Sequence, residues 1–258
     1  MISLLFAFAA LQGAPPAASE EAQLRSCTET VRTDPEQAVR KASEWRVSGG
    51  GLSARHCLAL AYVQLERWGP AATEFEQAAR EAELKQDPRA AEYWTQSGNA
   101  WLAGGEFASA RKALDAALAT SSLTPELRGE VLFDRARAAF AADDVQAARL
   151  DIDKGLALVP SDPFGWYLSA ALARQSDDLA RARTDIGKAV TLAPDDADVL
   201  LEAGNISGLA GDTDIARAFY MRAIKASPQS PAGRAAQAAI VENGLEPASA
   251  AAPPDQSR

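Results

Sequence analysis

The sequence contains few of the residue types that enzymes use for catalysis and metal binding. Its 258 residues include one histidine, His56, and two cysteines. A single histidine supplies neither a spaced set of metal ligands nor an evident partner for a serine or cysteine nucleophile. The Gly-x-Ser-x-Gly nucleophile motif and the Gly-x4-Gly-Lys-Ser/Thr phosphate-binding motif are both missing. We therefore expect no catalytic residues, no metal site and no cofactor.

The sequence also lacks a long hydrophobic run. Residues 1–12 are mostly apolar, but this run of about ten residues is too short to span a bilayer as a helix. Small residues follow at 13–18, a pattern typical of a secretory signal peptide cleaved between Ala14 and Ala18. We expect residues 1–18 to be removed and the mature protein, without membrane insertion, to be periplasmic or secreted. Because no Lys or Arg precedes the apolar run, a cytoplasmic protein remains the alternative.

The chain has fewer basic than acidic residues. The chain has 26 Lys and Arg residues against 35 Asp and Glu residues, which gives a formal net charge of −9. An acidic surface is repelled by nucleic-acid phosphates and by anionic membrane surfaces. The composition therefore disfavours both as partners, and the simplest role of the charge is solubility.

What the sequence does contain is a fixed period of 34 residues. Pro160, Pro194 and Pro228 are spaced at this interval, and the residues before each proline repeat in step. An alanine lies 12 residues before each proline, a bulky residue 8 before and a small residue 5 before. A period of this length predicts stacked units instead of one globular core. The repeated residues are Ala148, Ala182 and Ala216, then Ile152, Ile186 and Tyr220, then Gly155, Ala189 and Ala223.

This spacing resembles the tetratricopeptide repeat, a helix–turn–helix unit with the pattern W-x2-L-G-x2-Y, A-x3-F, P. The clearest match begins at Trp94 and continues through Gly98, Ala110 and Leu114. Gly or Asp pairs, such as Gly104-Gly105, suit the short turn between the two helices of a unit. The resemblance covers about residues 52–230. It implies an all-α fold, a right-handed α-solenoid of stacked helix–turn–helix repeats.

The chain is expected to divide into five segments along this solenoid. Stacked repeats need a terminal cap, and a segment rich in Ala, Pro and Ser favours disorder. The expected segments are the signal peptide (1–18), a degenerate N-terminal helical pair (19–51), about five repeat units (52–230), a C-terminal capping helix (231–244) and a disordered tail (245–258).

The two cysteines fall in the first helices of consecutive units. First helices of neighbouring units pack side by side in such an array, so Cys27 and Cys57 are expected to meet and form a disulfide. A bond closing a loop of about 30 residues stabilises the fold by roughly 3–4 kcal/mol in the chain-entropy model. The alternative is that both are buried apolar thiols.

In this family the concave face is lined mainly by first-helix residues that the packing motif leaves free. Applied to this chain, the resemblance implies a set of partner-contacting positions along the array. These are Leu60, Val63, Asn99, Leu102, Phe133, Arg137, Phe140, Phe164, Tyr167, Arg174, Asn205 and Leu209.

The middle of this set is unusually aromatic for solvent-facing positions. Phe133, Arg137 and Phe140 share one helix face, and Phe164 and Tyr167 flank them from the next unit. We predict a groove in which the rings bury an apolar anchor while Arg137 or Arg174 pairs with a carboxylate. The alternative is that the rings pack against one another inside the stack.

These patterns together favour a non-enzymatic scaffold that binds a peptide or helix of another protein on its concave face and uses no cofactor and no metal. The expected setting is the bacterial envelope. The alternative from another class is a structural self-association module, in which the outer face or an exposed end makes a homo-oligomer.

Overall fold

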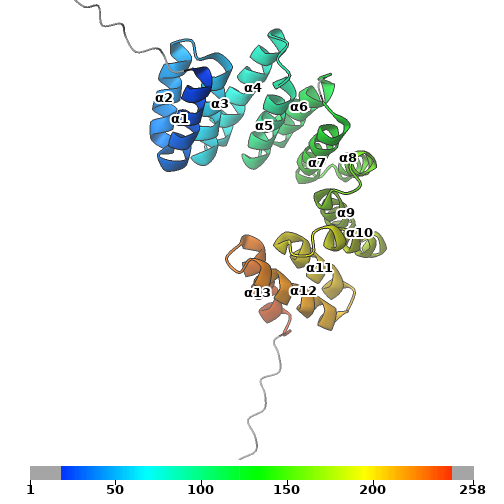
Figure 1. The fold of residues 1–258 in the computed structure, drawn as a ribbon. Helices are drawn as coiled ribbons and strands as arrows, with labels where there is room; N and C mark the ends of the chain where they lie inside the picture. Colours follow the sequence, from blue (N-terminus) through cyan, green and yellow to red (C-terminus); the bar gives the residue numbers. More distant parts are fainter. Residues whose placement is uncertain (1–18, 122, 246–258) are drawn as a thin grey trace, which may run out of the picture.

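The chain folds as an array of helical hairpins. The computed structural model describes residues 19–121 and 123–245, which form thirteen helices and no strand (Figure 1). The all-α solenoid that the sequence predicted is therefore confirmed for these residues. The predicted signal peptide and the predicted tail after Leu245 lie outside the described residues.

Consecutive helices pair as hairpins, and the hairpins stack into a crescent (Figure 1). Odd-numbered helices line the inner wall, where α5 contacts α7, α7 contacts α9 and α9 contacts α11. The inner helices are α1 (Glu20–Thr33), α3 (Gly51–Gln64), α5 (Ala90–Ala103), α7 (Pro125–Ala141), α9 (Pro163–Gln175), α11 (Ala197–Leu209) and α13 (Pro231–Glu242). The outer helices are α2 (Pro35–Val47), α4 (Trp68–Leu84), α6 (Phe107–Ala119), α8 (Val145–Leu158), α10 (Leu179–Leu192) and α12 (Thr213–Ala226).

The turn residues explain where these helices stop and start. Asp143 and Asp177 have positive φ values of 60° and 59°, a left-handed conformation that Asp tolerates better than most residues. The next residue, Asp144 or Asp178, accepts a hydrogen bond from a backbone N–H in the first turn of α8 or α10. Each Asp pair thus ends one helix and caps the next.

Adjacent helices approach closely where a glycine faces an aromatic ring. A Cβ atom at Gly155 of α8 would lie 2.4 Å from the Phe133 ring, and one at Gly165 of α9 would lie 2.3 Å from it. Phe133 is consequently fully buried, with 0% of its surface exposed. This corrects the prediction that Phe133 faces the solvent on the concave side, because two glycines let α8 and α9 close over its ring.

The N-terminal hairpin is tied to the array by a covalent bond. Cys27 of α1 and Cys57 of α3 form the disulfide expected from the sequence, with their Cα atoms 6.2 Å apart. Both residues lie in one apolar cluster with Val31, Ala38 and Leu58. The hairpin of α1 and α2 is thereby part of the stack.

The single histidine is a packing residue of the inner helix α3. The imidazole of His56 lies edge-on to the ring of Tyr93, with 5.5 Å between centroids, and 6.1 Å from that of Phe75. Burial lowers the pKa of His56 below its usual value, since the charged form is poorly solvated there.

No helix within the described ranges is long and apolar enough to cross a membrane.

Replacing Gly155 by Ala tests the close approach around Phe133. The added methyl group must displace a buried ring, so we expect the free energy of unfolding to fall by about 1–3 kcal/mol. Gly187 is the matched control, because it is an exposed α10 residue with no atom within 4 Å of an added Cβ. Gly187→Ala should raise the stability by up to about 1 kcal/mol. Urea unfolding followed by circular dichroism measures both, and a Gly155→Ala variant as stable as Gly187→Ala would contradict this packing.

Removing the disulfide tests the attachment of the N-terminal hairpin. Cys27 and Cys57 are separated by 30 residues, so the double Ala variant should lose about 3–4 kcal/mol of stability. In a stacked array the loss should be local, so hydrogen exchange should accelerate in α1–α3 and stay unchanged in α9–α12. Intact mass before and after reduction reports whether the bond is present. Equal exchange in α1–α3 of the oxidised protein and the variant would show that the bond carries no stability.

Candidate functional site

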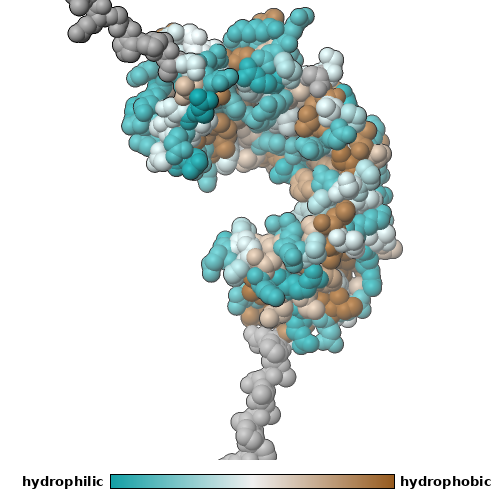
Figure 2. Space-filling model, in the orientation of Figure 1, coloured by the Kyte–Doolittle hydropathy of each residue, from teal (hydrophilic) through white to brown (hydrophobic). Residues whose placement is uncertain are grey.

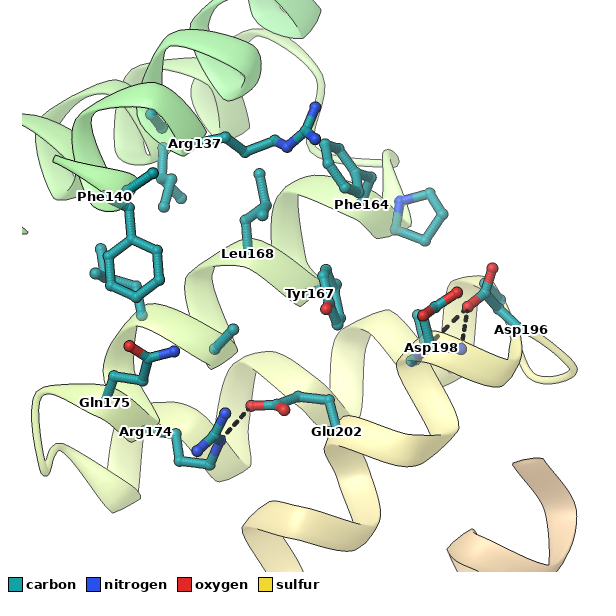
Figure 3. Close-up of a pocket in the computed structure, with 18 of the residues that line it drawn as sticks. Arg137, Phe140, Phe164, Tyr167, Leu168, Arg174, Gln175, Asp196, Asp198 and Glu202 are labelled. Atoms are coloured by element: carbon teal, nitrogen blue, oxygen red, sulfur yellow. Dashed lines mark hydrogen bonds and ion pairs between the residues drawn. The ribbon is translucent and has the colours of Figure 1, made fainter. Parts of the chain in front are cut away.

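The inner wall has a groove where three successive units meet. It has a volume of about 710 Å³ and lies between α7, α9 and α11, with its far edge at the end of α5 (Figure 3). Figure 2 shows apolar surface gathered on this bend of the crescent. We call it the central groove. Its lining includes Leu102, Phe107, Arg137, Phe140, Phe164, Tyr167, Leu168, Ala171, Arg174, Gln175, Asp196, Asp198, Val199 and Glu202.

The floor of the central groove is one face of α9. Phe164, Tyr167, Leu168 and Ala171 follow one another at spacings of three, one and three residues, which places them on the same side of the helix. The rings of Phe164 and Tyr167 stack with centroids 6.2 Å apart, and Phe164 rests edge-on against buried Phe133. Phe164 nevertheless remains 38% exposed. The floor is therefore a fixed aromatic platform that is open to solvent.

Arg137 forms the α7 side of the groove. Its guanidinium pairs with the carboxylate of Asp134 at 3.1 Å and lies 5.9 Å from the centre of the Phe164 ring. Asp134 also accepts a hydrogen bond from Nδ2 of Asn99 in the preceding unit, at 2.8 Å. Arg137 thus extends over the aromatic floor while its charge is balanced by its own helix.

Arg174 is held by a buried carboxylate from the next unit. Its Nε donates to Oε1 of Glu202 at 2.6 Å, and Glu202 is only 5% exposed. Asn205 donates to the other Glu202 oxygen at 3.3 Å, and the Tyr220 hydroxyl donates to Asn205 at 3.1 Å. This chain of contacts joins α9, α11 and α12. Arg174 and Asn205, which we expected to contact a partner, are occupied within the protein.

The α11 side of the groove carries two carboxylates. Oδ1 of Asp196 accepts from the backbone N–H groups of Asp198 and Val199, both at 3.0 Å, and so caps α11. None of the ion pairs among the described residues involves Asp196 or Asp198. Burial raises the pKa of the nearby Tyr167 phenol, and the negative charges of Glu202 and Asp198 raise it further. The phenol is therefore a neutral hydrogen-bonding group at the floor.

The other predicted contact residues lie at the edges of the groove or outside it. Leu102 lines its α5 edge. Leu60 and Val63 are partly buried against the core of the first units. Asn205 and Leu209 line a separate, smaller hollow near the C-terminal end. The structure thus brings together Leu102, Arg137, Phe140, Phe164, Tyr167 and Arg174, but not the rest.

Several groove residues were not predicted from the sequence. Leu168 and Ala171 share a helix face with Phe164 and Tyr167, so their spacing along α9 is a signal from which they could have been predicted. Asp196 and Asp198 resemble ordinary helix N-terminal residues, and only their place beside α9 makes them groove residues.

Groups of three or more His, Cys, Asp or Glu side chains able to hold a metal ion do not occur in the described part of the chain.

Comparison with known proteins supplies the family and similar folds. A tetratricopeptide repeat model matches residues 58–125, 98–163 and 167–231. PilW, described as a widely conserved type IV pilus biogenesis factor, is 20% identical with a TM-score of 0.65, covering 83% of this chain and 96% of PilW. PilF of Pseudomonas aeruginosa is 19% identical with a TM-score of 0.62, covering 85% of this chain and 97% of PilF.

A chain of the APC/C hetero-tetramer Cut9–Hcn1 is 16% identical with a TM-score of 0.63, covering 86% of this chain and 43% of the other. No curated protein sequence matches the chain significantly. The structural likenesses show a shared fold, and the family model matches more than half of the sequence. The chain therefore belongs to the tetratricopeptide repeat family, whose members generally serve as non-catalytic scaffolds for protein–protein interaction.

Proposed function

We propose that the protein binds a segment of a partner protein in the central groove and catalyses no reaction. The observation that carries this proposal is the exposed aromatic platform of Phe164 and Tyr167 at the bottom of a concave surface. Apolar side chains gain free energy when they leave water, at roughly 25 cal/mol per Å². Covering the exposed part of Phe164 alone contributes about 2 kcal/mol by this measure.

The shape of the groove favours a peptide segment over a flat protein surface. Its volume of about 710 Å³ lies in the range of pockets that enclose drug-sized molecules. This is room for a few side chains of an extended segment or for one face of a helix. Because the platform rests on buried Phe133 and α9 is tied to α11 by Arg174 and Glu202, the site is preformed. A preformed site loses little entropy when it binds.

For the cellular setting we propose export to the bacterial periplasm or the extracellular medium. A disulfide between Cys27 and Cys57 is typical of proteins in oxidising compartments. The apolar start of the sequence fits an export signal. PilW, which shares the fold, is described as a type IV pilus biogenesis factor, and pilus assembly takes place in the envelope.

Self-association is the second candidate. Several apolar side chains of the outer helices are at least half exposed, among them Leu150 of α8 and Ile215 and Met221 of α12. A second copy of the chain would cover such residues. The central groove combines a concave shape with an exposed aromatic floor, so partner binding there is the proposal that we put first.

Site-specific photo-crosslinking tests the proposal in the native cell. A benzoylphenylalanine placed at Tyr167 should crosslink one discrete partner, whose attached peptide mass spectrometry identifies. The same residue placed at Leu150, on the outer surface, is the matched control and should not capture that partner. Adding Phe140→Ala to the protein that carries benzoylphenylalanine at position 167 should reduce the crosslinking yield several-fold, because this change removes apolar surface from the groove. Equal capture from both positions would contradict groove binding, and self-crosslinks from position 150 alone would favour the oligomer.

A further inference from the structure

The charges around the central groove are unequally neutralised. Both of its guanidinium groups have a partner within the protein, since Arg137 pairs with Asp134 and Arg174 with Glu202. Its α11 side carries Asp196 and Asp198, which take part in no ion pair of the described residues. The charge that remains available to a ligand is therefore negative. The sequence led us to expect the opposite pairing, of Arg137 or Arg174 with a partner's carboxylate.

These two carboxylates, which form no ion pair, lie next to the aromatic platform. Figure 3 shows Asp196 and Asp198 at the side of the groove near Tyr167 and Phe164, with Phe140 at the opposite side. Both belong to the N-terminal end of α11, where negative charge is favourable to the helix dipole. A cation placed there would stand beside the platform and in contact with solvent, so little desolvation would oppose it.

We propose that the segment bound in the central groove is basic, with an apolar anchor on Phe164 and Tyr167 and a Lys or Arg beside Asp196 and Asp198. This inference rests on the proposed function and specifies the chemistry of its partner. The net charge of −9 adds long-range attraction for a basic segment. A second copy of this chain would bring the same negative charge and is therefore disfavoured as the occupant.

An acidic segment would bring its charge next to carboxylates that already balance Arg137 and Arg174. A carboxylate paired with Arg174 would share its guanidinium with buried Glu202, so two negative charges would lie around one cation. A carboxylate paired with Arg137 would lie near Asp134 in the same way. Like charges placed together in an interface are unfavourable. A basic segment meets no such repulsion from these carboxylates.

A displayed library of random 12-residue peptides, selected on the full chain, tests the inference without knowledge of the partner. We expect enriched peptides to combine an aromatic or large aliphatic residue with a Lys or Arg within one helical turn. Fluorescence anisotropy of the best peptide should show about tenfold weaker binding to the double variant Asp196→Asn, Asp198→Asn. Asn keeps the cap of α11 while it removes the charge. Binding to the parent should also weaken as salt rises.

Two further variants make each outcome decisive. Asp177→Asn is the matched charge control, because Asp177 is exposed, has no ion pair among the described residues and lies at the opposite end of α9. It should leave binding unchanged, and Asn tolerates its positive φ of 59°. Tyr167→Ala should abolish binding by removing half of the platform. Phe140→Ala replaces it if Tyr167→Ala lowers the helical circular dichroism signal.

The outcomes separate the inference from the proposed function. Acidic peptides that lose binding to Tyr167→Ala would overturn the basic partner and keep the groove. The same conclusion would follow from peptides that bind the double Asn variant with the affinity that they have for the parent. Peptides that bind Tyr167→Ala and Phe140→Ala undiminished, or a library with no enriched sequence, would overturn both.

Discussion

The contact of Phe133 with Gly155 and Gly165 is the constraint on which the central part of the molecule depends. The ring belongs to α7, and the two glycines belong to α8 and α9, so a single aromatic side chain joins two successive units. Each unit of a solenoid buries apolar surface only against its neighbours. The position of α9 relative to α7 is thereby fixed, and Phe164 rests on Phe133. The groove exists because this packing holds its floor in place.

Polar contacts then set the chemistry of the inner wall. The chain of contacts from Arg174 through Glu202 and Asn205 to Tyr220 holds α9, α11 and α12 together and balances the charge of one guanidinium of the groove. Away from the groove, Arg135 of α7 makes two hydrogen bonds to buried Asp151 of α8 within one hairpin. Buried pairs of this kind add little net stability, because the cost of removing both charges from water offsets their attraction. The unpaired carboxylates of α11 are left as the distinctive charge of the concave face.

The repeat could be predicted from the sequence because it is a property of spacing along the chain, where alanines, turn aspartates and prolines recur at fixed intervals. The nearness of Cys27 and Cys57 followed from the same stacking. The surface was harder to predict. Phe133 and Phe140 are two helical turns apart on nearly the same face, yet only Phe133 is fully buried, because only there do glycines bring the next helices over the ring. The pairing of Arg174 with Glu202 joins residues of different units, and one sequence does not reveal which side chains meet between units.

The central claim is that a preformed concave groove receives a segment of another protein. The most direct measurement is a structure of the chain bound to the partner that it captures. The account predicts a segment lying across α9, with an apolar side chain on Phe164 and Tyr167, and with the backbones of α7, α9 and α11 placed as in the free protein. A partner seated on the outer helices, with the central groove left open to solvent, would contradict it.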